Sequence, residues 1–386
     1  RISRIIGLDV MGIDIIAETL DKPLTEQNAG IIEINCGPGF RMHLSPSEGK
    51  PRNVGKAVVD MLFPEGAEHS IPICAITGTN GKTTTTRLIS HILNISGCVV
   101  GMSSTGAVVV NNIPILKGDY SGPMGAQSVM KDATVDHAVL EVARGGILRR
   151  GLGFKKCDVG VLLNVSSDHL GLDGIDTLEQ LARVKGVVTE SVKKDGYAVY
   201  NADDQLVVDR AHLTPGTPIF FSMDKENPIL LENLKKGNVN VTIDNDEIVL
   251  QREGGNFAIA RVDEVPITFD GQAKFNVQNV MAAVGATFGL GVSEEHIRAG
   301  LISFSSTIGQ SPGRMNVFDI GDMKVVLDYG HNVGAVHATG EFLRNMMPGR
   351  VIRLSEGSGD RKTEDIIEFG QALAHYSDYH IIADTA

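Results

Sequence analysis

Residues 77–87, Thr-Gly-Thr-Asn-Gly-Lys-Thr-Thr-Thr-Thr-Arg, combine glycines, a lysine and hydroxyl groups in an order suited to holding phosphate groups. The apolar run 71–76 predicts a buried strand, the glycines predict a tight turn, and apolar residues at helical spacing predict a helix that begins near Lys82. The N–H groups and dipole at a helix start favour an anion there. Lys82 would place positive charge near the β- and γ-phosphates, and the Thr83 hydroxyl would ligate Mg²⁺. We therefore predict a nucleoside triphosphate site.

The spacing differs from the standard phosphate-binding loop, because Gly78 lies three residues before Gly81 rather than five. An ordinary strand, turn and helix with a chance Gly-Lys-Thr is the alternative interpretation. The order of strand, glycines, lysine and threonines favours phosphate binding.

An acid and a histidine follow two further predicted strands. The segment 136–142 is predicted as a strand that contains Glu141, and 159–164 as an apolar strand followed by Asp168 and His169. Strands that alternate with helices predict a parallel sheet, whose ligand-binding residues gather at the carboxyl ends of the strands. Glu141 and His169 are therefore candidate metal ligands and catalytic residues beside Lys82. A solvated or capping acid and a surface histidine are the alternatives.

Lys185 lies among apolar residues of a helix predicted over 178–192. A lysine in that setting most simply extends its ammonium group to water. From its surroundings alone, the sequence assigns it no function.

The segment 1–65 carries two predicted strands, 12–17 and 30–35, joined by a turn-rich stretch. If the strands pair antiparallel, alternation can set Asp14, Glu33 and Asn35 on one face. Two carboxylates and an amide oxygen suit a Mg²⁺ that carries phosphates. The alternative is the polar, solvent-facing side of a hairpin.

Composition narrows the class of protein. The formal net charge of −12 and pI near 5.4 argue against nucleic acid or an anionic membrane as the main partner. The four cysteines are far apart and three lie in or beside apolar runs, which predicts buried, reduced thiols. No apolar run approaches the ~20 residues of a membrane span, and we expect a cytoplasmic α/β protein.

The 386 residues are expected to form three parts. Residues 1–65 would be the end of one domain, followed by a small, polar linker. Residues 71–305 would form a central domain with a parallel sheet and, over about 218–269, a β-rich insertion. Residues 312–386 would form an incomplete C-terminal lobe.

A triphosphate loop beside a second α/β lobe suggests ATP held between lobes, and no Asn-Lys-x-Asp motif supports a GTPase. Three lobes favour ATP-driven ligation, in which a carboxylate is phosphorylated and an amine displaces the phosphate.

Several motifs resemble the Mur ligase family along its length. They are 77–84 (Thr-Gly-Thr-Asn-Gly-Lys-Thr-Thr), Glu141, 164–170 (Asn-Val-Ser-Ser-Asp-His-Leu), 201–204 (Asn-Ala-Asp-Asp), 275–279 (Phe-Asn-Val-Gln-Asn), 312–314 (Pro-Gly-Arg) and 328–332 (Asp-Tyr-Gly-His-Asn). The first segment resembles the end of an ATP-grasp ligase through 12–15, 33–35 and 38–39. An ATP-grasp end fused to a Mur ligase core resembles the cyanophycin synthetase family, as do 40–43, 46–53 and 143–149 (Ala-Arg-Gly-Gly-Ile-Leu-Arg).

That resemblance implies a Mur ligase-like P-loop domain with a Rossmann-like C-terminal lobe, and a polymerase of L-aspartate and L-arginine. The ATP-grasp half would extend the aspartate backbone, and the Mur-like half would join arginine to an aspartate side chain of the growing Asp–Arg polymer. The implied cofactors are ATP and Mg²⁺, and the implied assembly is a homo-oligomer, a dimer or tetramer.

The resemblance also assigns roles by position. The residues that would bind the nucleotide are Thr79, Asn80, Gly81, Lys82, Thr83, Thr84, Asn279 (adenine), Arg314 (phosphates) and Asp328 (ribose). The metal ligands would be Thr83, Glu141, His169 and a carbamylated Lys185, with Asp14, Glu33 and Asn35 in the ATP-grasp site.

Two loops on the expected acceptor side depart from the family pattern. The chain has Ser-Thr-Gly-Ala at 104–107 where the family has Thr-Thr-Asp-Gly, and Gly-Asp-Tyr-Ser-Gly-Pro at 118–123 where the family has Gly-Asp-Thr-Thr-Gly-Pro. Three alternatives stay open at this point. One is a polymerase of preformed Asp–Arg dipeptides, another is a cell-wall or folylpolyglutamate ligase, and the third is a Mur-like half that serves only as a scaffold.

Overall fold

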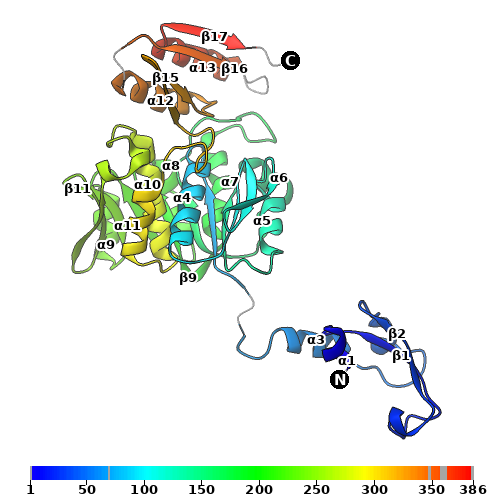
Figure 1. Ribbon diagram of the computed structural model, residues 1–386. Coiled ribbons are helices and arrows are strands. Elements are labelled where there is room, and N and C mark those ends of the chain that lie inside the picture. The colour runs from blue at the N-terminus through cyan, green and yellow to red at the C-terminus, as the bar shows by residue number, and fades with distance from the viewer. Residues whose placement is uncertain (1, 68–69, 347–348, 357–362, 384–386) are drawn as a thin grey trace. The chain divides into compact units, whose positions relative to one another are not determined.

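The computed structural model describes residues 2–67, 70–346, 349–356 and 363–383. It divides into two compact units, residues 1–70 and 71–386 (Figure 1). Each unit is described by itself. The predicted boundaries at 65/71 and 305/312 stay predictions; below, the middle lobe means residues 71–305 and the C-terminal lobe means residues 312–386.

The first unit is built on an antiparallel hairpin. Its elements are α1 (Ile2–Ile6), β1 (Gly12–Ile16), the 3₁₀ turn η1 (Leu24–Glu26), β2 (Gly30–Asn35), α2 (Arg41–Leu44) and α3 (Val54–Leu62). Helix α3 begins after Asn53, whose side chain accepts a hydrogen bond from the Lys56 N–H at 3.0 Å and so caps the helix. Both predicted strands are confirmed, with β1 one residue shorter than predicted.

A mixed, mostly parallel sheet of 11 strands organises the second unit. In spatial order its strands are β13 (Gly255–Arg261), β12 (Glu247–Arg252), β11 (Asn240–Asp244), β10 (Thr217–Ser222), β9 (Val192–Asn201), β8 (Cys157–Leu162), β3 (Ile73–Thr77), β7 (His137–Glu141), β4 (Val100–Ser103), β5 (Ala107–Val110) and β6 (Ile113–Lys117). Strands β4, β7, β3, β8, β9 and β10 run parallel to their neighbours in this series. Their carboxyl ends therefore share one edge of the sheet.

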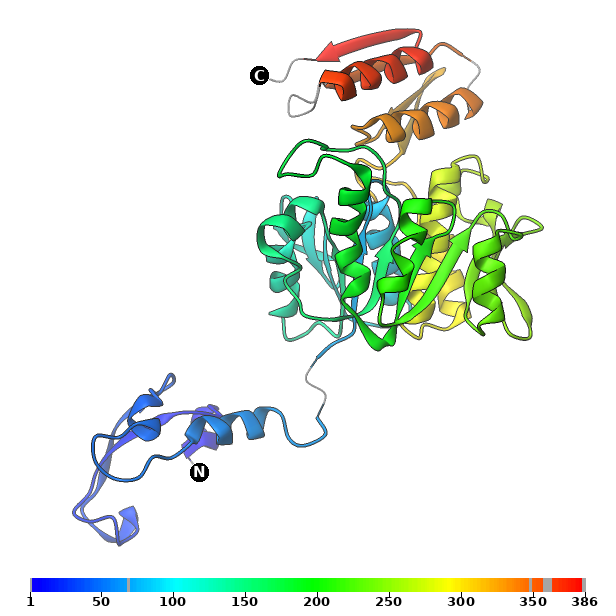
Figure 2. The same cartoon turned by 180° about the vertical axis from the view of Figure 1, so that it is seen from behind.

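Helices cover both faces of the sheet (Figures 1 and 2). One face, the nearer in Figure 1, packs against α4 (Lys82–Ile95), α10 (Lys274–Gly289) and α11 (Glu294–Ser303). The other face, the nearer in Figure 2, packs against α5 (Pro123–Met130), α6 (Arg144–Arg150), α7 (Leu178–Glu190), α8 (Gln205–Val208) and α9 (Pro228–Lys235). Alternate residues of β3 face the two cores, Cys74 and Ile76 toward one and Ile73 and Ala75 toward the other, as the period of a strand requires.

The helix predicted to begin near Lys82 begins at that residue, and the helix predicted over 178–192 ends at Glu190. Its start is fixed by a capping box, in which Thr177 and Gln180 bond each other's backbone N–H. Its end comes earlier than predicted because Val192 already pairs with Cys157 of β8.

The β-rich region predicted over 218–269 is confirmed, but it does not stand apart from the sheet. Strand β10 pairs in parallel with β9 and β11, and the hairpins β11–β12 and β12–β13 extend the same sheet to its edge. The region also contains the helix α9, which alternation of apolar residues did not indicate. Asn227 caps α9 and Pro228 occupies its first turn, two signals of a helix start.

The C-terminal lobe contains the hairpin β14 (Asn316–Ile320) and β15 (Met323–Leu327), then α12 (Val333–Met346), β16 (Ile352–Glu356), α13 (Thr363–Tyr376) and β17 (Tyr379–Ala383). Strands β16 and β17 are parallel. The fully buried Phe342 of α12 packs against Phe269 and Phe275 of the middle lobe, with ring centroids 5.0 and 6.3 Å apart. This apolar contact holds the lobe at the carboxyl edge of the large sheet.

All four cysteines are free thiols, as predicted; the prediction that they are buried is confirmed for Cys74 and Cys157, whereas Cys98 is only partly buried and Cys36 is exposed. Burial raises the pKa of Cys74 well above its ordinary value and that of Cys157 to about 12, so both stay protonated at neutral pH. Among the described residues, no helix is both long and apolar enough to cross a membrane.

Candidate functional site

Hydrogen bonds from the side chain of Asn164 hold the loop between β3 and α4 in place. The Asn164 side chain accepts hydrogen bonds from the N–H groups of Thr79 and Asn80 at 3.1 and 2.8 Å, and donates to the Asn80 carbonyl at 3.1 Å. Gly81 has φ +86°, and an added Cβ would lie 2.1 Å from the Asn279 side-chain oxygen. The loop therefore needs glycine here both for its conformation and for the close approach of α10.

Two lysines donate hydrogen bonds to the same backbone carbonyl of this loop. Lys82 Nζ donates to the Gly78 carbonyl at 3.0 Å and to that of Thr79 at 2.8 Å. Lys185 Nζ, from α7, donates to the same Gly78 carbonyl at 2.9 Å. Burial lowers the pKa of both ammonium groups, and for Lys185 the nearby charge of Lys82 lowers it further. The prediction that Lys185 reaches water fails, since only 4% of the residue is exposed.

Thr83 and Glu141 meet at the start of α4. The Thr83 hydroxyl lies 3.0 and 3.2 Å from the two carboxylate oxygens of Glu141, which is 1% exposed. Glu141 also accepts hydrogen bonds from the Thr105 N–H at 3.1 Å and the Thr105 hydroxyl at 2.9 Å. Arg314 of the C-terminal lobe donates to the Thr83 hydroxyl at 3.1 Å. The arrangement puts a carboxylate and a hydroxyl, both oxygen donors suited to Mg²⁺, beside the loop.

The C-terminal lobe contacts the loop through a reciprocal pair of amides. Asn80 Nδ2 donates to Asn332 Oδ1 at 3.2 Å, and Asn332 Nδ2 donates to Asn80 Oδ1 at 2.9 Å. Asp328 accepts hydrogen bonds from the N–H groups of Met315 and Gly330 at 2.9 and 2.8 Å. These bonds fix the loop that follows β15 and orient the Asp328 carboxylate.

His169 lies near Asp168 and His331. Its Nε2 is 3.8 Å from Asp168 Oδ1, and His331 Nε2, from the C-terminal lobe, is 3.8 Å from Asp168 Oδ2. Arg144 of α6 donates to the His169 carbonyl at 2.5 Å and to the Asp173 carboxylate at 2.9 Å, which holds this loop in place.

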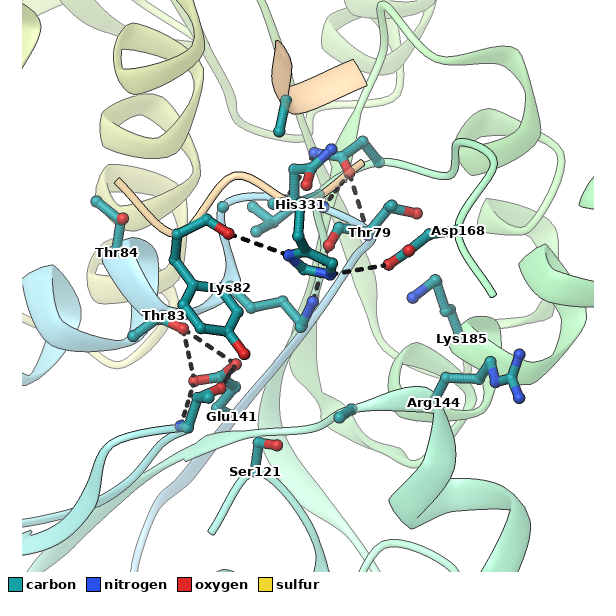
Figure 3. A pocket seen from close by; sticks show the side chains of 18 of the residues that line it. Thr79, Lys82, Thr83, Thr84, Ser121, Glu141, Arg144, Asp168, Lys185 and His331 are labelled. Carbon is teal, nitrogen blue, oxygen red and sulfur yellow. Dashed lines mark hydrogen bonds and ion pairs between the residues drawn. The ribbon is translucent and has the colours of Figure 1, made fainter. Parts of the chain in front are cut away.

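All the residues predicted in the second unit line a single cavity of about 740 Å³, a size typical of nucleotide and small-molecule sites. They are Thr79, Asn80, Gly81, Lys82, Thr83, Thr84, Glu141, His169, Lys185, Asn279, Arg314 and Asp328. The cavity also contains Asp119 and Ser121, from one of the two loops that depart from the family pattern. The Ser121 N–H and hydroxyl both donate to Asp119 Oδ1, at 3.0 and 2.6 Å. Figure 3 shows Lys82, Thr83 and Glu141 together on one side of this cavity.

The residues Asp14, Glu33 and Asn35 belong to the first unit. Asp14 lies directly opposite Glu33 in the hairpin, and Asn35 follows Glu33 at the period of one strand face, so all three share a face as predicted. Asp14 and Glu33 are exposed. Their role as metal ligands stays a prediction.

Asp168, which was predicted to gather with Glu141 and His169 at the strand ends, also lines the cavity. The sequence motifs contained four residues whose place in the site we did not predict, namely Thr105, Asn164, His331 and Asn332. Asn164 follows a predicted strand, and that position was the available signal. Thr105 lies in one of the divergent loops, and its contact with Glu141 depends on strand order. For His331 and Asn332, no local pattern indicates which residue of the middle lobe each one meets.

Comparisons with known proteins agree with this architecture. The family model of the Mur ligase middle domain matches residues 76–287, and that of the Mur ligase C-terminal, glutamate ligase domain matches 313–386. Cyanophycin synthetases of Geminocystis herdmanii and a Synechocystis species are 46% and 44% identical to the chain over 384 residues. All of this chain is covered in both comparisons, but it spans only 44% of the length of each of these relatives.

Two solved structures share the fold. A MurF from Acinetobacter baumannii has a TM-score of 0.60 at 20% identity, with 81% of this chain and 63% of that chain covered. A bifunctional folylpolyglutamate synthase/dihydrofolate synthase, crystallised with Mn, AMPPNP and L-glutamate, has a TM-score of 0.59 at 20% identity, with 80% and 74% covered. At this identity, the likeness concerns the fold.

Proposed function

This chain belongs to the Mur ligase family, and from that premise we propose that its cavity joins the α-amine of L-arginine to an aspartate side-chain carboxylate at the expense of ATP. The acceptor would be a growing Asp–Arg polymer. The similarity to cyanophycin synthetases over the whole chain supports this choice of substrates over a cell-wall or folate substrate.

The observation that carries the proposal is the pair of lysines on the Gly78 carbonyl. Two ammonium groups within hydrogen-bond distance of one oxygen repel each other, and burial adds to that cost. A polyphosphate lying over the loop would neutralise the charge of Lys82 and accept hydrogen bonds from the N–H groups at the start of α4, and carbamylation of Lys185 would remove the second positive charge. Thr79, Asn80, Gly81 and Thr84 line the cavity around this position.

The donor set also fits a divalent cation. Thr83 and Glu141 supply adjacent oxygen atoms, and Arg314 reaches the same hydroxyl from the other lobe. A Mg²⁺ bound there would neutralise charge on the β- and γ-phosphates. Lys185 is buried with a lowered pKa, so its amine is more readily neutral and able to react with CO₂ to give the carbamate that the family resemblance implies.

The reaction would proceed in two balanced steps. First, an aspartate carboxylate oxygen attacks the γ-phosphorus of ATP, which forms an acyl phosphate and releases ADP. The uncharged α-amine of arginine then attacks the acyl carbon, the new C–N bond forms, the C–O bond to phosphate breaks, and the amine loses a proton. Lys82 and Arg314 would stabilise the charge on the transferring phosphoryl group, since both line the cavity beside the loop.

The remaining assignments are parts of the same proposal. Asn279 would contact adenine and Asp328 the ribose; Asp14, Glu33 and Asn35 would hold Mg²⁺ in an ATP-grasp site that adds L-aspartate to the backbone. A homo-oligomeric state, dimer or tetramer, and a cytoplasmic location stay predictions.

Arginine-dependent ADP formation tests the proposal. The chain is incubated with ATP, Mg²⁺ and a short aspartate peptide, with and without L-arginine, and in parallel with a β-Asp–Arg dipeptide. We expect ADP formation that needs both peptide and arginine and that falls by about 10²–10³-fold in Lys82→Ala. Lys131→Ala, which changes an exposed lysine outside the cavity, should match the wild type.

Two outcomes would contradict the proposal. Consumption of ATP with the dipeptide but never with free arginine would point to a dipeptide polymerase. If ADP formation does not depend on arginine and is the same in wild type and Lys82→Ala, the Mur-like half is a scaffold without ligase activity.

A further inference from the structure

His331 brings an imidazole from the C-terminal lobe to two potential metal ligands of the middle lobe. One ligand atom from each of Asp168, His169 and His331 lies within 4.8 Å of the other two. The two Asp168 oxygens face different imidazoles, since Oδ1 is 3.8 Å from His169 Nε2 and Oδ2 is 3.8 Å from His331 Nε2. The rings of the two histidines have their centroids 6.2 Å apart. Figure 3 shows His331 directed toward Asp168.

We propose that Asp168, His169 and His331 bind one divalent cation that bridges the two lobes, and that this site prefers Mn²⁺ to Mg²⁺. Of these three residues, the family resemblance implies only His169 as a ligand. The new elements are the carboxylate of Asp168, the imidazole of His331 and the bridge between lobes. The site lies in the cavity of the proposed ligase and deepens that proposal, but its test uses the metal alone.

The distances suit a shared cation better than direct hydrogen bonds. A separation of 3.8 Å is too long for a hydrogen bond between nitrogen and oxygen. A metal about 2.1 Å from each of two ligands keeps those ligands within about 4.2 Å of each other. Each imidazole is already within this limit of one Asp168 oxygen, and because all pairs of ligand atoms lie within 4.8 Å, none needs to approach by as much as an ångström.

The backbone on each side holds the three side chains in place. His331 lies between Asp328, which accepts two backbone N–H groups, and Asn332, which pairs with Asn80 and caps the N–H of Ala335 at 2.9 Å. On the middle lobe, His169 has φ +55°, and Arg144 holds its carbonyl. Ligands held this way lose little freedom when a cation binds.

The ligand types set the metal preference. Mg²⁺ favours oxygen donors and keeps several waters, which fits Thr83 and Glu141. Two imidazoles and one carboxylate suit a transition metal such as Mn²⁺ better. The side chains of His169 and His331 are 37% and 40% exposed, whereas that of Asp168 is 13% exposed, so a cation can enter from solvent and complete its shell with water or phosphate oxygens.

A cation bound to both lobes would also favour the arrangement in which they meet. Among the described residues, the polar contacts between the lobes near the loop include Asn80 with Asn332 and Thr83 with Arg314, and Ser167 donates a hydrogen bond to Asp365 at 3.3 Å. Coordination bonds from His331 on one side and from Asp168 and His169 on the other would add to these contacts. We therefore expect Mn²⁺ to slow amide hydrogen exchange in residues 328–333.

Electron paramagnetic resonance of Mn²⁺, without nucleotide, tests the site. Titration of the wild type should reveal a bound Mn²⁺ whose pulsed spectra show coupling to imidazole nitrogen, a signal that Thr83 and Glu141 cannot produce. His331→Gln should weaken this binding by about 10-fold or more, reduce the nitrogen coupling and abolish the hydrogen-exchange effect. An equal concentration of Mg²⁺ should leave most of the Mn²⁺ in place.

Two controls separate this result from misfolding and from the ligase proposal. His337→Gln changes an exposed histidine of the same lobe, whose ring lies 3.2 Å from the Tyr376 hydroxyl, and should leave Mn²⁺ binding unchanged. Asp168→Asn, nearly isosteric, should weaken binding like His331→Gln. Lys82→Ala should retain Mn²⁺ binding even where it loses ADP formation. Equal Mn²⁺ affinity and equal nitrogen coupling in wild type and His331→Gln would overturn the bridge, and equal displacement by Mg²⁺ would overturn the preference.

Discussion

The two lobes contribute to the same cavity with side chains that are held in different ways. The floor, which we define as Lys82, Thr83, Glu141 and Lys185, belongs to the middle lobe, and Glu141 and Lys185 are 1% and 4% exposed. The wall, which we define as Arg314, Asp328 and His331, belongs to the C-terminal lobe and is only partly buried. Floor residues are oriented by bonds within their own lobe, such as those between Glu141 and Thr105.

The wall also makes contacts between the lobes. Arg314 donates to Thr83, and the loop that carries Asp328, whose carboxylate is oriented within its own lobe, is joined to the middle lobe by the Asn80–Asn332 pair. We infer that the floor is preorganised for charge stabilisation, whereas the wall contributes fully only when the lobes meet. Substitutions in the floor should therefore lower kcat, and substitutions in the wall should mainly raise KM for the nucleotide.

Glu141→Gln should produce the largest effect. The amide keeps the shape of the side chain but removes the charge that would bind Mg²⁺ beside Thr83, so we expect kcat to fall by about 10²–10³-fold. Steady-state kinetics over a range of Mg²⁺ concentrations would measure it. The control Glu232→Gln alters an exposed acid of α9. An unchanged kcat in Glu141→Gln would contradict the role of Glu141 as a Mg²⁺ ligand in the floor.

Asn332→Ala should have a smaller effect of a different kind. It removes both hydrogen bonds to Asn80, each worth about 1 kcal/mol, and leaves the floor intact. We expect KM for ATP to rise by about 5–30-fold with kcat changed little. A loss confined to kcat would contradict the division between floor and wall.

Lys185→Met tests the burial of a floor residue through its effect on thermal stability. The pKa of Lys185 is lowered by burial and by the Lys82 charge, so at pH 7 the unfolded chain binds this proton more strongly than the folded one. The lysine therefore destabilises the fold at pH 7, and this cost shrinks as pH rises toward its ordinary value of 10.5. In CO₂-free buffer, Lys185→Met should have a higher Tm than the wild type at pH 7, with the difference narrowing by pH 10.

Thermal unfolding at several pH values measures this difference. Lys131→Met, at an exposed position, should show no such trend. A Tm difference that does not change with pH would mean that folding does not lower the pKa of Lys185.

Three of the four floor residues, Lys82, Thr83 and Glu141, were predictable from sequence because they lie at or just after the ends of buried strands. Once β3, β7 and β8 were assigned as parallel, Lys82, Glu141 and His169 had to gather at one edge of the sheet, and they do. Burial of Lys185 was not predictable, since a lysine on an amphipathic helix usually reaches water. What buries it is the contact of α7 with the Gly78 carbonyl, 107 residues away in sequence.

For the wall, the sequence indicated the motifs but not the contacts that their residues make. The segment 328–332 identified a polar loop, but the meeting of His331 with Asp168 and of Asn332 with Asn80 depends on how the lobes pack through Phe342. Similarly, the alternating pattern of 218–269 indicated strands, but only strand pairing shows that they extend the large sheet. Local patterns specify elements and faces, whereas contacts between distant elements depend on the whole fold.

Binding of a non-hydrolysable ATP analogue tests the central claim most directly. Isothermal titration with Mg²⁺ present should give one binding event in the second unit for the wild type, and Lys82→Ala should weaken it by about 10-fold or more through loss of a charge-assisted contact. Lys131→Ala should bind as the wild type does. Equal affinity in Lys82→Ala and wild type, or no binding to either at saturating concentration, would contradict the claim that this loop and Lys82 hold a triphosphate.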